Sequence, residues 1–217
     1  GTVSQGLRVM QTSTATFKNG TLKAADYNQL KQVVHTYGDV TLDNFTVDAT
    51  EDSYAQVAVE PDCGTLNIIG NSSILAREGQ TGLYVAFWHT GTYDGTTVNV
   101  NTTGKITGKL VYEFDERKTG AEAATENKGV LNIGNGNFEI AEIETIFTES
   151  LADELKVPKI SVSGGTYTVD VSKYIATDKI VQKDGNTYKV VADGAITSGT
   201  YTSEPTVPSG YKATKND

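Results

Sequence analysis

The chain has 217 residues, with 18 Lys and Arg against 27 Asp and Glu and a net charge of -9. It contains no basic patch, so we expect no nucleic-acid partner, and no apolar run reaches the roughly 18 residues that a membrane span requires. The single cysteine, Cys63, excludes an intrachain disulfide framework and a Cys-rich metal site. The 22 Gly and 11 Tyr, with abundant Thr and Asn, favour strands and turns, so we expect an all-β protein.

The first element that we predict is a helix at about residues 24–37. Its apolar side chains recur at spacings of three and four residues: Tyr27, Leu30, Val33, Val34 and Tyr37. Asp26 places an acid in the first turn, and Gly38 ends the pattern. We expect this helix to cap the N-terminal end of the first strand layer, because exposed sheet edges invite aggregation.

A short motif then occurs five times, with Thr, Asn or Ser between two aliphatic residues. The copies begin at Val40, Leu66, Val98, Leu131 and Ile160, which are 26, 32, 33 and 29 residues apart. Each copy leads through a corner to a second apolar position: Val47, Ile74, Ile106, Phe138 and Tyr167. Repeats of roughly 20 to 50 residues are typical of solenoids. The uneven spacing fits stacked strands that are joined by loops of different lengths.

Two stretches between these copies are candidates for binding. Residues 83–88 form the most apolar run, and Trp88, His89 and Tyr93 lie at or just beyond its end. Flat aromatic rings stack on sugar faces, so these three residues are the candidate glycan platform. The alternative is that the aromatic side chains pack a core strand. His35 is the only other histidine and is distant in sequence, so we expect no metal site.

The second stretch is the acidic loop that contains Asp48, Glu51 and Asp52. Acidic loops can hold Ca²⁺, but this spacing matches no defined calcium loop, and hard cations need roughly six or more oxygen ligands. We therefore interpret this segment as a solvated turn.

The last part of the chain changes in character. Apolar residues at near-helical spacing predict a short amphipathic helix over residues 143–155. Farther on, Asp184 and Gly185 separate two alternating runs, which predicts a C-terminal β-hairpin. We place a solenoid domain with its N-terminal cap at 1–176, and the hairpin and a polar tail at 177–217.

Two segments of the chain carry a family resemblance. The run VSGGTYTVDVSKYIA at 162–176, followed by GNTYKVV at 185–191, resembles a segment of large surface proteins from gut-dwelling Gram-positive bacteria. In those proteins it ends a right-handed parallel β-helix of the pectate-lyase-like superfamily. The units at 66–68 and 131–133 are similar to the coils of these proteins, and the resemblance extends over residues 40–191. The sequence departs from the pattern of these proteins in two respects: several units lack a Gly-Gly corner, and the loop at 101–130 is longer than the pattern expects.

The resemblance implies a right-handed parallel β-helix (solenoid) that is secreted or attached to the cell surface. It also implies a structural or adhesive role and transfers no catalytic residue. We expect the chain to be part of a larger surface protein, with host or dietary glycans or host surface proteins as partners and no cofactor. A carbohydrate-binding module is the alternative function, and β-sandwich domains are the alternative fold.

A polysaccharide lyase or glycoside hydrolase is the second alternative, because such enzymes place acids beside one sheet of a parallel β-helix. The outward positions of the five copies are instead short and neutral: Thr41, Asn67, Asn99, Asn132 and Ser161. Four other acids are dense enough to consider: Asp48, Asp52, Glu113 and Asp115. These residues form no recognisable catalytic arrangement in the sequence, so we expect no enzyme.

Overall fold

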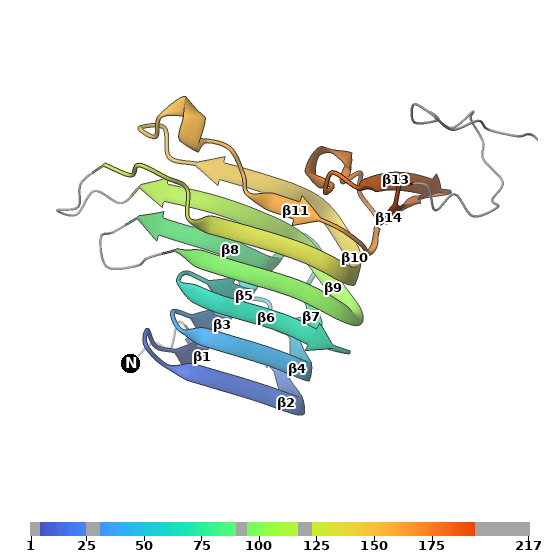
Figure 1. Ribbon diagram of the computed structural model, residues 1–217. Coiled ribbons are helices and arrows are strands. Elements are labelled where there is room, and N and C mark those ends of the chain that lie inside the picture. Colours follow the sequence, from blue (N-terminus) through green and yellow to red (C-terminus); the bar gives the residue numbers. More distant parts are fainter. Residues whose placement is uncertain (1–4, 25–30, 90–94, 117–122, 194–217) are drawn as a thin grey trace, which may run out of the picture.

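The computed structural model of the chain describes residues 5–24, 31–89, 95–116 and 123–193 (Figure 1). Within these ranges the protein is all-β, and its helical segments are two 3-10 helices, η1 (Asp153–Leu155) and η2 (Ser172–Tyr174). The strands are β1 (Gln5–Val9), β2 (Thr14–Lys23), β3 (Gln32–Thr36), β4 (Asp39–Asp48), β5 (Val57–Pro61), β6 (Gly64–Gly70), β7 (Ser73–Leu75), β8 (Thr81–His89), β9 (Thr96–Glu116), β10 (Gly129–Phe147), β11 (Ile160–Val162), β12 (Thr166–Tyr167), β13 (Lys179–Asp184) and β14 (Thr187–Ala192).

Strands of successive repeat units pair in parallel along three rows (Figure 1). The first row contains β2, β4, β6, β9, β10 and β11. The second contains β1, β3, β5, β8, β9 and β10. The third contains β2, β4, β7, β9, β10 and β12. The long strands β9 and β10 pass through all three rows, so each unit lies on the unit before it.

The five predicted copies lie in register within the first row. Their first residues pair in the order Val40, Leu66, Val98, Leu131 and Ile160. Their second apolar positions pair in the order Val47, Ile74, Ile106, Phe138 and Tyr167 in the third row. The predicted stacking of these units is therefore confirmed. Antiparallel pairing of sequence neighbours, which a β-sandwich would show, occurs here at the C-terminal strands β12, β13 and β14.

The apolar side chains of the repeated units fill one interior. Leu66, Val98 and Leu131 have no exposed surface, and all belong to a single hydrophobic core that extends along the stack. Phe138 and Tyr167 continue the stack as nearly parallel rings with centroids 4.7 Å apart. Since side chains alternate between the two faces of a strand, the residue between two core positions points away from this interior.

The predicted N-terminal capping helix is wrong. Of residues 24–37, those at 25–30 lie outside the described residues, and Gln32–Thr36 forms β3. Most of β3 is buried on both faces, and Val33 and Val34 are consecutive apolar residues. The strand therefore lacks the alternation of apolar and polar residues by which a half-buried strand is recognised in a sequence. The amphipathic helix at 143–155 is also wrong, because β10 continues to Phe147 and only η1 is helical. No helix in the described ranges is long and apolar enough to cross a membrane.

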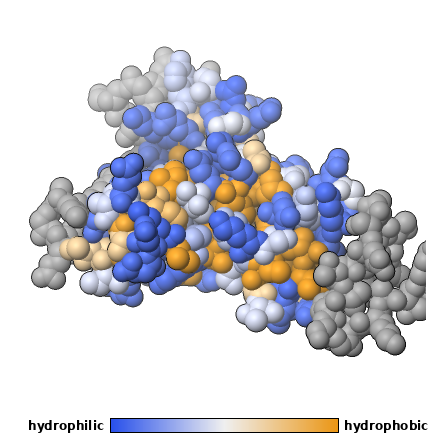
Figure 2. Space-filling view, turned by 90° about the horizontal axis from the view of Figure 1, so that it is seen from above, coloured by the Kyte–Doolittle hydropathy of each residue, from blue (hydrophilic) through white to orange (hydrophobic). Residues whose placement is uncertain are grey.

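The C-terminal hairpin is confirmed. Strands β13 and β14 pair antiparallel with Asp184 opposite Thr187, so Gly185 and Asn186 make the turn. Strand β14 also pairs antiparallel with β12 at the edge of the stack (Figure 1). Seen from above this end, the surface shows hydrophobic patches among hydrophilic ones (Figure 2).

Candidate functional site

The predicted glycan platform begins at the end of β8. Phe87 stacks on Phe114 in a small apolar cluster, with ring centroids 4.8 Å apart. Trp88, the next residue, therefore points to the opposite face of the strand. Its ring is half-buried, and its Nε1 donates a hydrogen bond to Glu113 Oε2 at 3.0 Å. His89 is half-buried next to Phe87, and Tyr93 lies outside the described residues, so the three-residue platform stays a prediction.

Glu113 connects Trp88 to a second aromatic residue. It lies on β9 in register with Ala86 of β8. The hydroxyl of Tyr84, two residues before Ala86, also donates to the Glu113 carboxylate. Burial and the negative charge of Glu113 raise the pKa of Tyr84, so this phenol keeps its proton at neutral pH. One carboxylate thus holds two aromatic side chains on the outer face of the second strand row.

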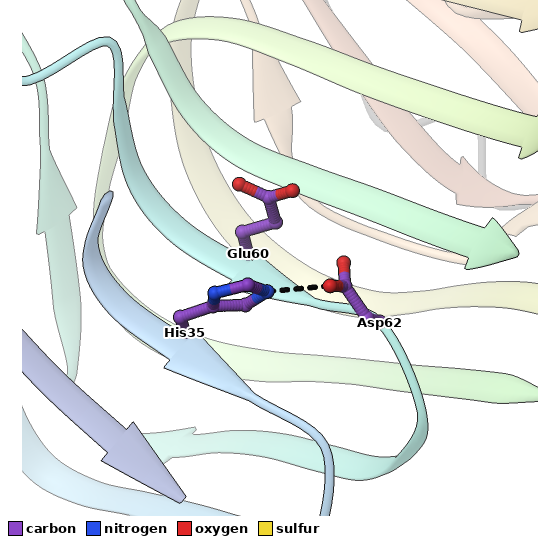
Figure 3. A group of neighbouring side chains, drawn as sticks. All are labelled: His35, Glu60 and Asp62. Atoms are coloured by element: carbon purple, nitrogen blue, oxygen red, sulfur yellow. Dashed lines mark hydrogen bonds and ion pairs between the residues drawn. The ribbon is translucent and has the colours of Figure 1, made fainter. Parts of the chain in front are cut away.

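Three ionisable side chains that we did not predict converge on the same face (Figure 3). His35 of β3 pairs in register with Glu60 of β5, and Asp62 follows two residues later. His35 Nε2 lies 2.5 Å from Asp62 Oδ2. The three residues are 2%, 4% and 0% exposed, so a polysaccharide chain has no direct access to them in this conformation.

The burial of this group has an electrostatic consequence for Glu60. Burial raises its pKa from 4.5 to about 7, and the negative charges of Asp62 and Glu113 act in the same direction. A hydrogen bond with Gln32 and the nearby His35 oppose the shift. Glu60 therefore retains a proton into the neutral range, where an ordinary glutamate is ionised.

His35 joins the two groups into one site. Its ring lies 4.5 Å from that of Tyr37 and meets the ring of Trp88 edge-on at 6.4 Å. We call the combined set the outer-face cluster; it consists of His35, Tyr37, Glu60, Asp62, Tyr84, Trp88 and Glu113. The cluster combines aromatic rings, carboxylates and an imidazole, which can bind sugar hydroxyls, exchange protons or coordinate a metal ion.

The remaining candidate acids lie elsewhere or have other partners. In the acidic loop, Asp48 Oδ1 accepts hydrogen bonds from the amide and hydroxyl of Thr50. Asp52 Oδ1 accepts from the amides of Tyr54 and Ala55. Both aspartates thus support the turn through local bonds. Asp115 accepts a hydrogen bond of 2.7 Å from the hydroxyl of Thr148.

The outward positions of the repeated units form a second regular feature. Asn99 donates to Asn67 and accepts from Asn132, both at 3.0 Å between the amide atoms. This ladder of amides follows the register Asn67, Asn99, Asn132. The outward asparagines of three successive units are therefore hydrogen-bonded to one another along the stack.

Sequence reasoning missed His35, Glu60 and Asp62, although a signal for them exists. His35 and Glu60 are 25 residues apart, close to the 26 residues between Val40 and Leu66. Two polar residues separated by one repeat fall side by side when the units stack. We did not recognise this relation, because the prediction placed His35 in a helix and not in a stacked strand.

Comparison of the chain with family models, with curated proteins and with solved structures gives no match. The resemblance to surface proteins of the pectate-lyase-like superfamily therefore stays a prediction.

Proposed function

We propose that this chain is a non-catalytic module of an extracellular bacterial protein, secreted or attached to the cell surface. We further propose that it is built as a right-handed parallel β-helix with a structural or adhesive role. The observation that carries the proposal is the in-register stack of five units on one continuous apolar core. Such a stack makes a stiff body whose loops vary freely in length, which suits a scaffold that displays surfaces. The neutral ladder of asparagines and the burial of Glu60 and Asp62 argue against polysaccharide cleavage.

Two measurements test this proposal. The purified chain is incubated with plant polysaccharides and mucin glycans, and the release of new reducing or unsaturated ends is followed. We expect none; depolymerisation that Glu113→Gln abolishes would overturn the non-catalytic role. Protease treatment of intact cells that express the full-length protein should release peptides of this chain. Release only after lysis would contradict an extracellular location.

Carbohydrate binding is the second candidate, and the anchored ring of Trp88 favours it. A half-buried indole whose nitrogen is held by Glu113 offers a preoriented apolar face beside polar groups. Trp88 is the only tryptophan of the chain, so its fluorescence reports on this position alone. Quenching by acrylamide, followed by a glycan array with mucin and plant polysaccharides, tests the candidate directly.

A matched pair of variants makes the glycan experiment specific. Trp88→Ala should abolish any binding, whereas Tyr54→Ala removes an exposed aromatic ring that lies outside the outer-face cluster and should leave binding unchanged. Equal losses in the two variants would mean that the platform is not at Trp88.

A further inference from the structure

We propose that His35, Glu60 and Asp62 form a binding site for one divalent transition-metal ion of the zinc class. Each of the three offers one ligand atom, and these atoms all lie within 4.8 Å of one another. The side chains meet on the outer face of two neighbouring strand segments (Figure 3). A metal ion there would link two successive repeat units.

The placement follows from the strand register. Val34 and Val59 are paired core residues of β3 and β5, so His35 and Glu60, the next residues, point together to the opposite face. Asp62 is two residues beyond Glu60, and its amide donates to the Thr36 carbonyl, which keeps the parallel ladder going to this point. Two neighbouring parallel strands and the residue that directly follows β5 thus bring the imidazole and both carboxylates to one place.

The donor set selects the class of ion. One imidazole nitrogen and two carboxylate oxygens suit zinc and its transition-metal neighbours. Calcium is disfavoured, because it requires roughly six to eight oxygen ligands. A neutral imidazole with two carboxylates balances the charge of a divalent cation. This balance matters here because all three groups are buried and uncompensated charge in a protein interior is costly.

The ion would replace the contact between His35 and Asp62. Their closest atoms are 2.5 Å apart, whereas two ligands of a tetrahedral zinc ion are separated by about 3.3 Å. Binding therefore requires these side chains to move apart by roughly 1 Å. The ring of Tyr37 packs at a tilt against the imidazole, and Gln32 hydrogen-bonds to Glu60, so surrounding groups already orient two of the three ligands.

Zinc titration of the chelator-treated full chain tests the site. We expect one ion per chain by calorimetry and a higher midpoint of thermal unfolding, because the folded chain alone presents the three ligands together. Cobalt(II) should bind at the same place and quench the fluorescence of Trp88, whose ring is 6.4 Å from that of His35. X-ray absorption of the zinc complex should show nitrogen and oxygen neighbours with an imidazole contribution.

Variants show whether these residues hold the ion. Glu60→Gln and Asp62→Asn are close in shape to the wild-type side chains and should each weaken zinc binding by more than about tenfold. His89→Gln removes the other histidine of the chain and should leave the affinity unchanged. The proposal fails if the wild-type chain shows neither a zinc-dependent shift in unfolding nor cobalt quenching. It also fails if binding survives in Glu60→Gln and Asp62→Asn, or is lost in His89→Gln.

Discussion

Glu60 is an acid whose protonation state is coupled to folding. Its pKa is raised from 4.5 to about 7, first by burial and then by the charges of Asp62 and Glu113, against the opposing effects of Gln32 and His35. Between these two pKa values the folded chain keeps a proton that the unfolded chain releases. The contribution of Glu60 to stability is therefore present at low pH and is lost as the pH rises through about 7. The full shift corresponds to about 3 kcal/mol.

This linkage predicts the behaviour of Glu60→Gln in the presence of a chelator. The amide has no proton to lose, so we expect the variant to gain stability relative to wild type as the pH rises from about 5 to about 8. The gain should approach about 3 kcal/mol, with Tyr84 protonated throughout. Urea unfolding at several pH values measures it. A difference between the two proteins that does not change with pH would show that Glu60 is ionised in the folded chain over this whole range.

The amide ladder predicts an ordered pair of stability losses. Asn99→Ala removes two side-chain hydrogen bonds, to Asn67 and from Asn132, whereas Asn132→Ala removes the bond to Asn99 alone. At about 1 kcal/mol for each bond, Asn99→Ala should cost about 2 kcal/mol and Asn132→Ala about half as much. Chemical denaturation of both variants checks the order. Equal losses of stability in the two variants would mean that the number of ladder hydrogen bonds removed does not determine the loss.

The first and third strand rows could be predicted from the sequence, because the repeated motif shows which residues of successive units are equivalent. Once Leu66, Val98 and Leu131 are recognised as equivalent, parallel stacking fixes their neighbours. The predicted helix at 24–37 failed because β3 is buried on both faces, and a short run of this kind has no period of two. The site was missed for the same reason: His35 and Glu60 become neighbours only when β3 and β5 are paired. Trp88 was identified from the apolar run at 83–88, but its hydrogen bond to Glu113 depends on tertiary packing.

The corner between β11 and β12 illustrates how closely successive units approach each other. A Cβ atom at Gly164 would lie 2.2 Å from the carbonyl oxygen of Gly134 in the unit below. Gly164→Ala must therefore push two backbones apart, and we expect it to cost about 2 kcal/mol or more. Gly185→Ala in the hairpin turn is the control, since it has a positive φ of 56° but no neighbouring atom within 4 Å of its added Cβ. It should cost about 1 kcal/mol; an equal or larger loss would contradict steric control of the corner.

We expect the stack to unfold locally from its two ends before it unfolds as a whole. Strand β9 has neighbours on both sides: it pairs with β6, β7 and β8 on one side and with β10 on the other. Among the described strands, β1 pairs only with β3, and β2 pairs only with β4. In a stacked array each unit is stabilised by its neighbours, so a unit with two neighbours opens at a higher free energy than one with a single neighbour. Native-state hydrogen exchange should therefore show the slowest amides in β9 and the adjoining part of β10. Exchange should be faster in β1, β2 and the hairpin β13–β14. If β1 and β2 exchange as slowly as β9, the chain opens as one cooperative unit, and nearest-neighbour stacking does not govern its stability.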